Sequence, residues 1–155
     1  KKAMANLEQQ NFLPILNKKV IKEKVPTMGI CLGMQLLFEK SKEGNCNGLG
    51  WIKGEVVHFN FNDKTNKLKI PHMGWNKVKV KKESNLSLNL YNENKFYFVH
   101  SYHAICNNKK DVLMTTKYGY EFVSAIEKDN ISGFQFHPEK SHKYGKKLFE
   151  NFINL

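Results

Sequence analysis

The sequence predicts an α/β fold, with a mixed, largely parallel sheet flanked by helices, and three observations carry this prediction. The apolar segment 25–30 lies between two helical patterns, which is typical of a strand buried in a parallel sheet. Later segments are short and rich in β-branched and aromatic residues, and several alternate apolar with polar positions, as half-buried strands do. The segment 142–154 places its apolar residues on one face of a helix and closes the chain.

The chain before residue 25 is predicted to be helical. Ala3, Leu7 and Gln10 follow a helical spacing, the segment 11–14 interrupts it, and a second helix ends in the charged run 22–24. The strand over 25–30 needs neighbours on both sides, and no earlier segment has the pattern of a strand. We therefore expect residues 1–155 to form a single domain, and one or two strand-helix units to precede Lys1.

A helix is expected directly after this strand. Met34, Leu36, Leu37 and Phe38 form its buried face, and the glycine-containing segment 41–50 ends it. The other strands are expected, in chain order, over 55–59, 75–80, 95–100, 112–116, 122–127 and 131–136. Turn-prone residues separate them, beginning with a turn over 60–63.

The composition favours a globular protein and argues against two classes of partner. The chain has 155 residues, 41% of them hydrophobic, and no apolar run is long enough for a membrane span. Its net charge of +11 comes from lysine alone, and the sequence has no arginine, the residue best suited to reading bases and phosphates. We therefore expect no nucleic-acid or membrane partner. A lysine-rich solvated surface explains the charge, with an acidic docking partner or a phosphorylated substrate as the alternatives.

Cysteine usage predicts a reducing, cytoplasmic compartment. The three cysteines are Cys31, Cys46 and Cys106. They form no C-x-x-C motif, and an odd number cannot all be paired, so neither a disulfide framework nor a zinc cluster is indicated. His100, His103 and Cys106 are spaced by three residues, a set that does not share one face of a strand. No metal or cofactor is expected.

The segment 29–33, Gly-Ile-Cys-Leu-Gly, has the form G-x-C-x-G of a nucleophile elbow, in which a sharp strand-to-helix turn exposes the nucleophile. In so tight a turn, side chains at Gly29 and Gly33 are expected to clash. The helix N-terminus is expected to lower the pKa of the Cys31 thiol. The alternative is a buried structural cysteine in an ordinary turn.

A nucleophilic cysteine needs a base and a group that orients the base. His137 follows the strand 131–136, and Glu139 is close enough to hold one tautomer of its imidazole. The order Cys31, His137, Glu139 fits strand-end loops that converge at one edge of a sheet. The other histidines are expected to be packed or at the surface, except His72, whose turn leaves its role open.

Two motifs carry a resemblance to a known family. Residues 29–39, Gly-Ile-Cys-Leu-Gly-Met-Gln-Leu-Leu-Phe-Glu, and residues 137–141, His-Pro-Glu-Lys-Ser, resemble the class I, triad-type glutamine amidotransferases. Residues 71–76, Pro-His-Met-Gly-Trp-Asn, and 98–102, Phe-Val-His-Ser-Tyr, are similar to the glutaminase subunits of imidazole glycerol phosphate synthases, which serve histidine biosynthesis. The resemblance covers most of the chain and implies a flavodoxin-like α/β fold.

The resemblance implies hydrolysis of L-glutamine through a glutamyl thioester on Cys31. His137 would accept the thiol proton and protonate the leaving amine, and Glu139 would orient it. The residues that the resemblance places around the substrate are Gln35, Ser101, Tyr102, Leu32 and Gly29, with the Leu32 amide as first oxyanion donor. The family's upstream P-G-x-G loop, which completes the oxyanion hole, has no match in this chain.

The resemblance also implies a heterodimer with a (β/α)₈-barrel cyclase that receives the ammonia. Its predicted contacts are Met73, Trp75, Asn76, Lys140 and Ser141. The alternatives are a paralogous glutaminase that serves another acceptor, such as a sugar amidation step, a non-catalytic regulatory or binding module, and a cysteine peptidase of related fold.

Overall fold

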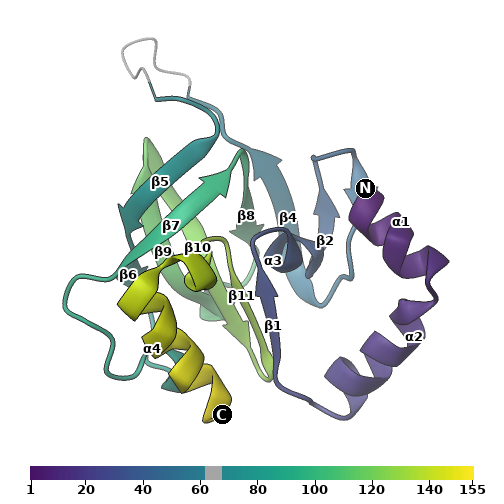
Figure 1. The fold of residues 1–155 in the computed structure, drawn as a ribbon. Coiled ribbons are helices and arrows are strands. Elements are labelled where there is room, and N and C mark those ends of the chain that lie inside the picture. Colours follow the sequence, from purple (N-terminus) through teal and green to yellow (C-terminus); the bar gives the residue numbers. More distant parts are fainter. Residues whose placement is uncertain (62–67) are drawn as a thin grey trace.

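The computed structural model describes residues 1–61 and 68–155, and it shows a curled sheet with helices packed against it (Figure 1). In this view α1 and α2 lie on the side of β2, and α4 lies on the opposite side, below β7. The expected turn over 60–63 extends into residues outside the described part. The α/β class with a mixed sheet is confirmed.

The helices begin and end close to their predicted bounds, with one exception. The helical elements are α1 (Lys2–Gln9), α2 (Phe12–Leu16), the π-helix η1 (Asn17–Lys22), α3 (Leu32–Leu36), α4 (His142–Ile153) and the short 3₁₀ turns η2 (Asn85–Ser87), η3 (Lys109–Asp111) and η4 (Pro138–Lys140). Asn11 has a φ of 55° and separates α1 from α2, as the break over 11–14 predicts. No helix in the described residues is long and apolar enough to cross a membrane.

The main sheet combines parallel and antiparallel pairs in the order β1-β11-β10-β8-β4-β2-β3, with β9 beside β10 and β6 beside β9. The strands are β1 (Thr27–Ile30), β2 (Phe38–Ser41), β3 (Cys46–Asn47), β4 (Ile52–His58), β5 (His72–Lys77), β6 (Lys79–Val80), β7 (Lys95–His100), β8 (Tyr102–Cys106), β9 (Val112–Tyr118), β10 (Tyr120–Lys128) and β11 (Ile131–Phe134). Strands β5 and β7 form a second, two-stranded sheet.

The expectation of a largely parallel sheet is wrong. Within the described residues only β1–β11 and β2–β4 pair in parallel, and the other strand pairs are antiparallel. Short connections explain the difference, because parallel neighbours need a long crossover whereas a hairpin needs only a tight turn. Gly119, with a φ of 74°, joins β9 to β10, and Asp129, with a φ of 53°, lies in the turn between β10 and β11.

The helix expected after Cys31 is shorter than predicted, because α3 ends at Leu36 and Phe38 begins a strand. The carbonyls that would continue the helix are occupied: Leu36 accepts from the Leu49 amide at 2.7 Å, and Phe38 accepts from the Gly50 amide at 3.0 Å. Strands β2 and β3 lie where the sequence predicts the end of the helix and a loop, so they were not predicted. Strand β8 was not predicted either. Alternation fails in β8, where His103 and Ala104 are buried in succession.

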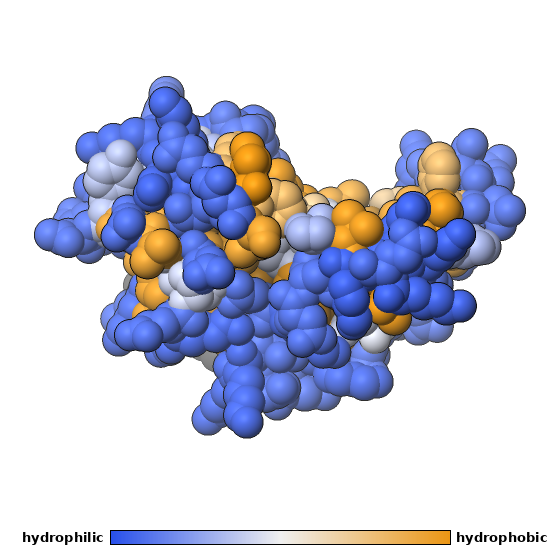
Figure 2. Space-filling model, turned by 90° about the horizontal axis from the view of Figure 1, so that it is seen from below, coloured by the Kyte–Doolittle hydropathy of each residue, from blue (hydrophilic) through white to orange (hydrophobic). Residues whose placement is uncertain are grey.

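Two clusters of buried side chains form the core. The larger cluster packs the main sheet against β7 and α4, and its aromatic members are Phe59, Phe96, Phe98, Phe122, Phe134 and Phe136. The smaller lies around α3, η1 and β4 and includes Val20, Met34, Phe38, Ile52 and Ile126. From below, the surface is mostly hydrophilic, with hydrophobic residues gathered between the two ends (Figure 2).

A pair of buried histidines connects β5 to β7. His72 and His100 are partners in the strand register, and His72 Nδ1 lies 3.0 Å from His100 Nε2. His100 Nδ1 lies 2.7 Å from the Tyr102 carbonyl oxygen, which can only accept, so His100 donates there and accepts from His72. His72 Nε2 then accepts from the Asn76 amide at 3.2 Å. His72 is thus a core residue, which settles the role that the sequence left open.

Burial keeps both histidines neutral, since it lowers the pKa of His72 to about 4 and that of His100 to about 3. Unfolding returns them to ordinary values near 6.5, so below that pH the unfolded chain binds more protons than the folded chain. The free energy of unfolding should therefore decrease as pH falls from about 6.5 towards about 4.

We predict that His72→Gln, which keeps an N–H donor for His100 but does not titrate, loses less stability on acidification than the wild-type protein. Urea unfolding at pH of about 7.5 and about 5 measures the difference. His58→Gln, which makes the same change at an exposed position, is the matched control. An identical loss of stability in His72→Gln and wild type would contradict the prediction.

Candidate active site

Cys31 occupies the junction between β1 and α3 in a conformation that non-glycine residues rarely adopt. Its φ is 50° and its ψ is −107°, and strain of this kind is typical of nucleophiles on tight turns. Backbone hydrogen bonds hold it there: the Cys31 amide donates to the Phe134 carbonyl at 2.7 Å, and the Gln35 amide donates to the Cys31 carbonyl at 3.2 Å. The predicted sharp strand-to-helix turn is confirmed.

Gly29 makes this turn possible. A Cβ at Gly29 would lie 2.7 Å from the Gly33 carbonyl carbon and 2.8 Å from the Met34 nitrogen, both of them backbone atoms. The expected crowding at Gly33 is wrong, since a Cβ there would meet no described atom within 4 Å. Gly133, the partner of Gly29 in β11, lets α3 lie close to the sheet, because its Cβ would lie 2.8 Å from Met34 Cγ.

The thiol of Cys31 lies in a partly buried polar environment. Its Sγ donates to the Val99 carbonyl at 4.0 Å, and Gln135 Nε2 donates to Sγ at 3.7 Å. Burial raises the pKa of the thiol, and a hydrogen bond from the Leu32 amide opposes that rise. The expectation of a lowered pKa is wrong for this arrangement, because desolvation outweighs the backbone N–H at the start of α3.

His137 and Glu139 form the pair that the sequence predicts. His137 Nδ1 lies 2.6 Å from Glu139 Oε1, and because the carboxylate accepts, Nδ1 is the nitrogen that carries the proton in the neutral imidazole, whose Nε2 then holds the lone pair. Nε2 is buried and has no hydrogen-bond partner among the described residues. The described hydrogen bonds of the Cys31 thiol do not include His137.

Strand β7 contacts both His137 and Cys31. The His137 amide donates to the Tyr97 carbonyl at 2.8 Å, and the Ser141 hydroxyl donates to the His137 carbonyl at 2.6 Å while it accepts from the Tyr97 amide. Two residues further along β7, the Val99 carbonyl contacts the thiol. Strand β7 therefore fixes the backbone of His137 and also contacts the Cys31 thiol.

A cavity of about 390 Å³ opens beside the thiol, a volume that suits a small ligand. It is lined by Cys31, Leu32, Gln35, Glu43, Pro71, Val99, His100, Ser101 and Tyr102. The structure thus brings together Cys31, Leu32, Gln35, Ser101 and Tyr102, which the sequence analysis assigned to one site, whereas Gly29 supports the turn and does not line the cavity. The wall also contains Glu43, which sequence reasoning missed because it placed 41–50 in a helix-ending loop away from the site.

The side chain of Gln35 is held by two acceptors. Its Nε2 donates to the Tyr102 carbonyl at 3.1 Å and to Gln135 Oε1 at 2.9 Å. Gln135 is fully buried and was also missed. The signal was available, because Gln135 is the one polar residue between Phe134 and Phe136 in a segment predicted as a buried strand.

The predicted partner contacts divide between two faces of β5. Met73 and Trp75 point outward and are 61% and 46% exposed. Asn76 points inward, where its amide donates to the Lys117 carbonyl at 3.1 Å and contacts His72.

The predicted partner contacts near η4 also differ in exposure. Lys140 is exposed, and its Nζ lies 6.0 Å from the centre of the Tyr97 ring. Ser141 is fully buried, so the expectation that it reaches the partner surface is wrong. The ring of Trp75 stacks on that of His142, with centres 5.6 Å apart, and its partner in the strand register, Tyr97, forms a bridge to His137.

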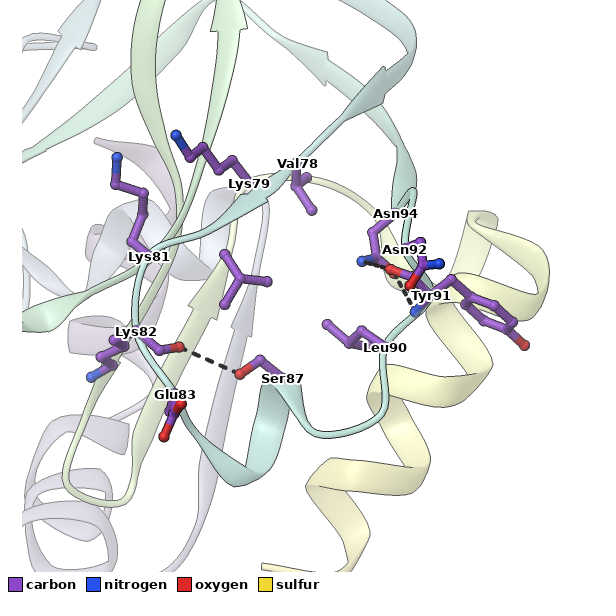
Figure 3. Close-up of a pocket in the computed structure, with 11 residues that line it drawn as sticks. Val78, Lys79, Lys81, Lys82, Glu83, Ser87, Leu90, Tyr91, Asn92 and Asn94 are labelled. Atoms are coloured by element: carbon purple, nitrogen blue, oxygen red, sulfur yellow. Dashed lines mark hydrogen bonds between the residues drawn. The ribbon is translucent and has the colours of Figure 1, made fainter.

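A separate hollow of about 610 Å³ lies between β6 and η2 and contains none of the predicted site residues (Figure 3). Three lysines line it, but Lys81 pairs with Glu121 at 3.2 Å and Lys82 pairs with Glu127 at 3.2 Å. Paired lysines make a weak anion site. The cavity beside Cys31 is therefore the better candidate.

Comparisons with known proteins agree with this geometry. A model of the family "Glutamine amidotransferase class-I" matches residues 9–155. The imidazole glycerol phosphate synthase subunit HisH 2 of Methanococcus maripaludis is 57% identical over 150 residues, which cover 97% of this chain and 73% of that protein. The HisH subunit of Sulfurimonas denitrificans is 50% identical over 97% of this chain and 72% of its own length.

Among solved structures, a glutamine amidotransferase of Thermotoga maritima has the same fold, with a TM-score of 0.58 at 19% identity. The match covers 96% of this chain and 56% of that one.

We predict that Gly29→Ala destabilises the protein by about 2 kcal/mol, the usual cost of forcing a carbon into a packed site. Gly33→Ala is the matched control, because its methyl group enters open space on a helix and should be neutral or slightly stabilising. Urea unfolding of both variants measures the free energies. Equal stabilities of the two variants would show that the turn does not depend on Gly29.

Proposed function

Because this chain belongs to the class I glutamine amidotransferases, we propose that the cavity beside Cys31 hydrolyses L-glutamine to glutamate and ammonia. The chain acts as the glutaminase subunit of an imidazole glycerol phosphate synthase and supplies ammonia to histidine biosynthesis. The observation that carries the proposal is the strained Cys31 turn, which presents a thiol and the Leu32 amide to a cavity of suitable size. The relatives favour this acceptor over a paralogous sugar amidation.

The reaction uses the proton positions that the site sets. His137 Nε2 holds a lone pair and accepts the Cys31 thiol proton, and Glu139 stabilises the imidazolium that results. The thiolate attacks the side-chain carbonyl carbon of glutamine, and the Leu32 N–H stabilises the oxyanion. The carbon–nitrogen bond then breaks, His137 returns the proton to the leaving amine, and ammonia departs. Water hydrolyses the remaining thioester and releases glutamate.

Charge in the cavity fits the substrate. Glutamine carries an α-ammonium group, and Glu43 provides a carboxylate in the same wall as Gln35 and Tyr102. Burial is the main cause of the raised pKa of the Cys31 thiol, and the charges of Glu139 and, to a smaller extent, Glu43 add to it. An ammonium group bound at Glu43 would neutralise that charge and remove part of the penalty, so substrate binding would help form the thiolate.

We further propose that Met73, Trp75 and Lys140 contact a cyclase subunit with a (β/α)₈ barrel. The support is that all three are exposed, that Trp75 stacks on His142, and that Lys140 directly follows Glu139 in the chain. Asn76 would act indirectly, because its side chain supports His72. Cys31, Cys46 and Cys106 are unpaired thiols, which supports a reducing, cytoplasmic location.

We predict that the protein with its cyclase hydrolyses glutamine and restores growth to a histidine auxotroph that lacks this subunit. Cys31→Ala should abolish both effects, because no thioester can form, and the complex with the cyclase should persist. Cys106→Ala is the control, since burial raises the pKa of that thiol to about 12 and it lies outside the cavity. Undiminished hydrolysis by Cys31→Ala would refute the catalytic assignment.

Trp75→Ala should weaken binding of the cyclase about tenfold or more, since exposed tryptophans often dominate the energy of an interface. Val80→Ala, an exposed apolar residue on β6, the next strand along the chain, is the matched control and should leave the affinity unchanged. Isothermal titration with the purified cyclase measures both. An unchanged affinity for Trp75→Ala would place the partner elsewhere.

A further inference from the structure

Gln135 is a buried amide whose side chain lies between two groups of the candidate site. Its residue is fully buried between Phe134 and Phe136, a position where an unpaired amide would be costly. Its backbone N–H donates to the Ser124 carbonyl at 2.9 Å, so the backbone is fixed independently of the side chain. The side chain then makes two contacts of its own, one to Gln35 and one to Cys31.

The orientation of the two amides follows from the hydrogen bonds around them. The Tyr102 carbonyl can only accept, so the group that Gln35 presents to it, at 3.1 Å, must be its NH₂. The same NH₂ lies 2.9 Å from Gln135, which must therefore present its oxygen. This leaves the NH₂ of Gln135 directed at Cys31 Sγ, 3.7 Å away. The Tyr102 carbonyl thus determines the orientation of both amides, and with it which group of Gln135 faces the sulfur.

This series gives Gln135 a function beyond filling the core. A hydrogen-bond donor to sulfur favours the thiolate over the thiol, and the bond strengthens as negative charge forms. The burial that raises the pKa of Cys31 is the effect such a donor opposes. Its oxygen meanwhile holds the Gln35 amide against the cavity wall.

We propose that Gln135 is a positioning residue for glutamine hydrolysis, which fixes the Cys31 sulfur and the Gln35 amide relative to each other and donates an N–H to the thiolate. The proposal rests on the function proposed above. It concerns a side chain outside the Cys31, His137 and Glu139 set.

The test compares Gln135→Glu, which keeps the size and the acceptor but removes the donor to sulfur, with Gln135→Met, which removes both contacts. Alkylation of Cys31 by iodoacetamide, followed by mass spectrometry across pH, gives the apparent pKa of this thiol in the full protein. We expect both variants to raise that pKa by about one unit or more, and Gln135→Met, which adds no charge, to show that loss of the donor is sufficient. Their kcat for glutamine should fall about tenfold, as for loss of a hydrogen bond to a charged group.

Gln135→Met should in addition raise KM, because Gln35 loses an acceptor. Ser124→Ala is the control: it is equally buried, its hydroxyl has no hydrogen-bond partner among the described residues, and the change leaves its carbonyl intact. Ser124→Ala should leave the alkylation profile and kcat as in wild type.

Several outcomes would overturn the inference. An unchanged alkylation profile and kcat in folded Gln135→Met would do so, and so would loss of folding in both Gln135 variants, which would indicate a purely structural role. Alkylation does not require turnover. A wild-type protein that hydrolyses no glutamine would therefore refute the proposed function, whereas the effect of Gln135 on the thiol would still be measured.

Discussion

The structure depends on one steric constraint, the close approach of Gly29 to the backbone of Gly33 and Met34. That approach allows the chain to reverse from strand to helix within one residue, and it forces Cys31 into a φ of 50°. The strain is held by neighbouring structure, since the Cys31 amide bonds the Phe134 carbonyl in β11. Parallel pairing of β1 with β11 is thus part of the site, because the same segment continues to His137 two residues after Gln135.

Strand β7 supplies the second support. Within this strand, Tyr97 holds the His137 backbone, Val99 contacts the Cys31 thiol, and His100 belongs to the buried histidine pair. A rigid strand positions such groups more accurately than a loop does, and β7 is held in place by its pairing with β5. The exposed aromatic surface of β5 therefore lies one strand away from the reacting groups.

The sequence predicted the features that depend on local chemistry. Short motifs or periodicity predict the elbow at Cys31, the His137–Glu139 contact and the strand that ends at His100. The structure confirms all three. Features set by distant segments were missed: the end of α3 depends on amides of residues 49–52, and the antiparallel pairing depends on which strands meet. Gln135 is visible in the sequence as a polar residue between two phenylalanines, but its role was missed for the same reason, since its partners are about a hundred residues away in the chain.

The shared acceptor at Tyr102 has a consequence for sequence variation. One carbonyl oxygen receives the His100 imidazole on one side and the Gln35 amide on the other. A backbone carbonyl is present whatever side chain the residue carries. The junction between the histidine pair and the cavity is therefore protected against substitution at position 102, and drift at that position can alter the shape of the wall without breaking the connection.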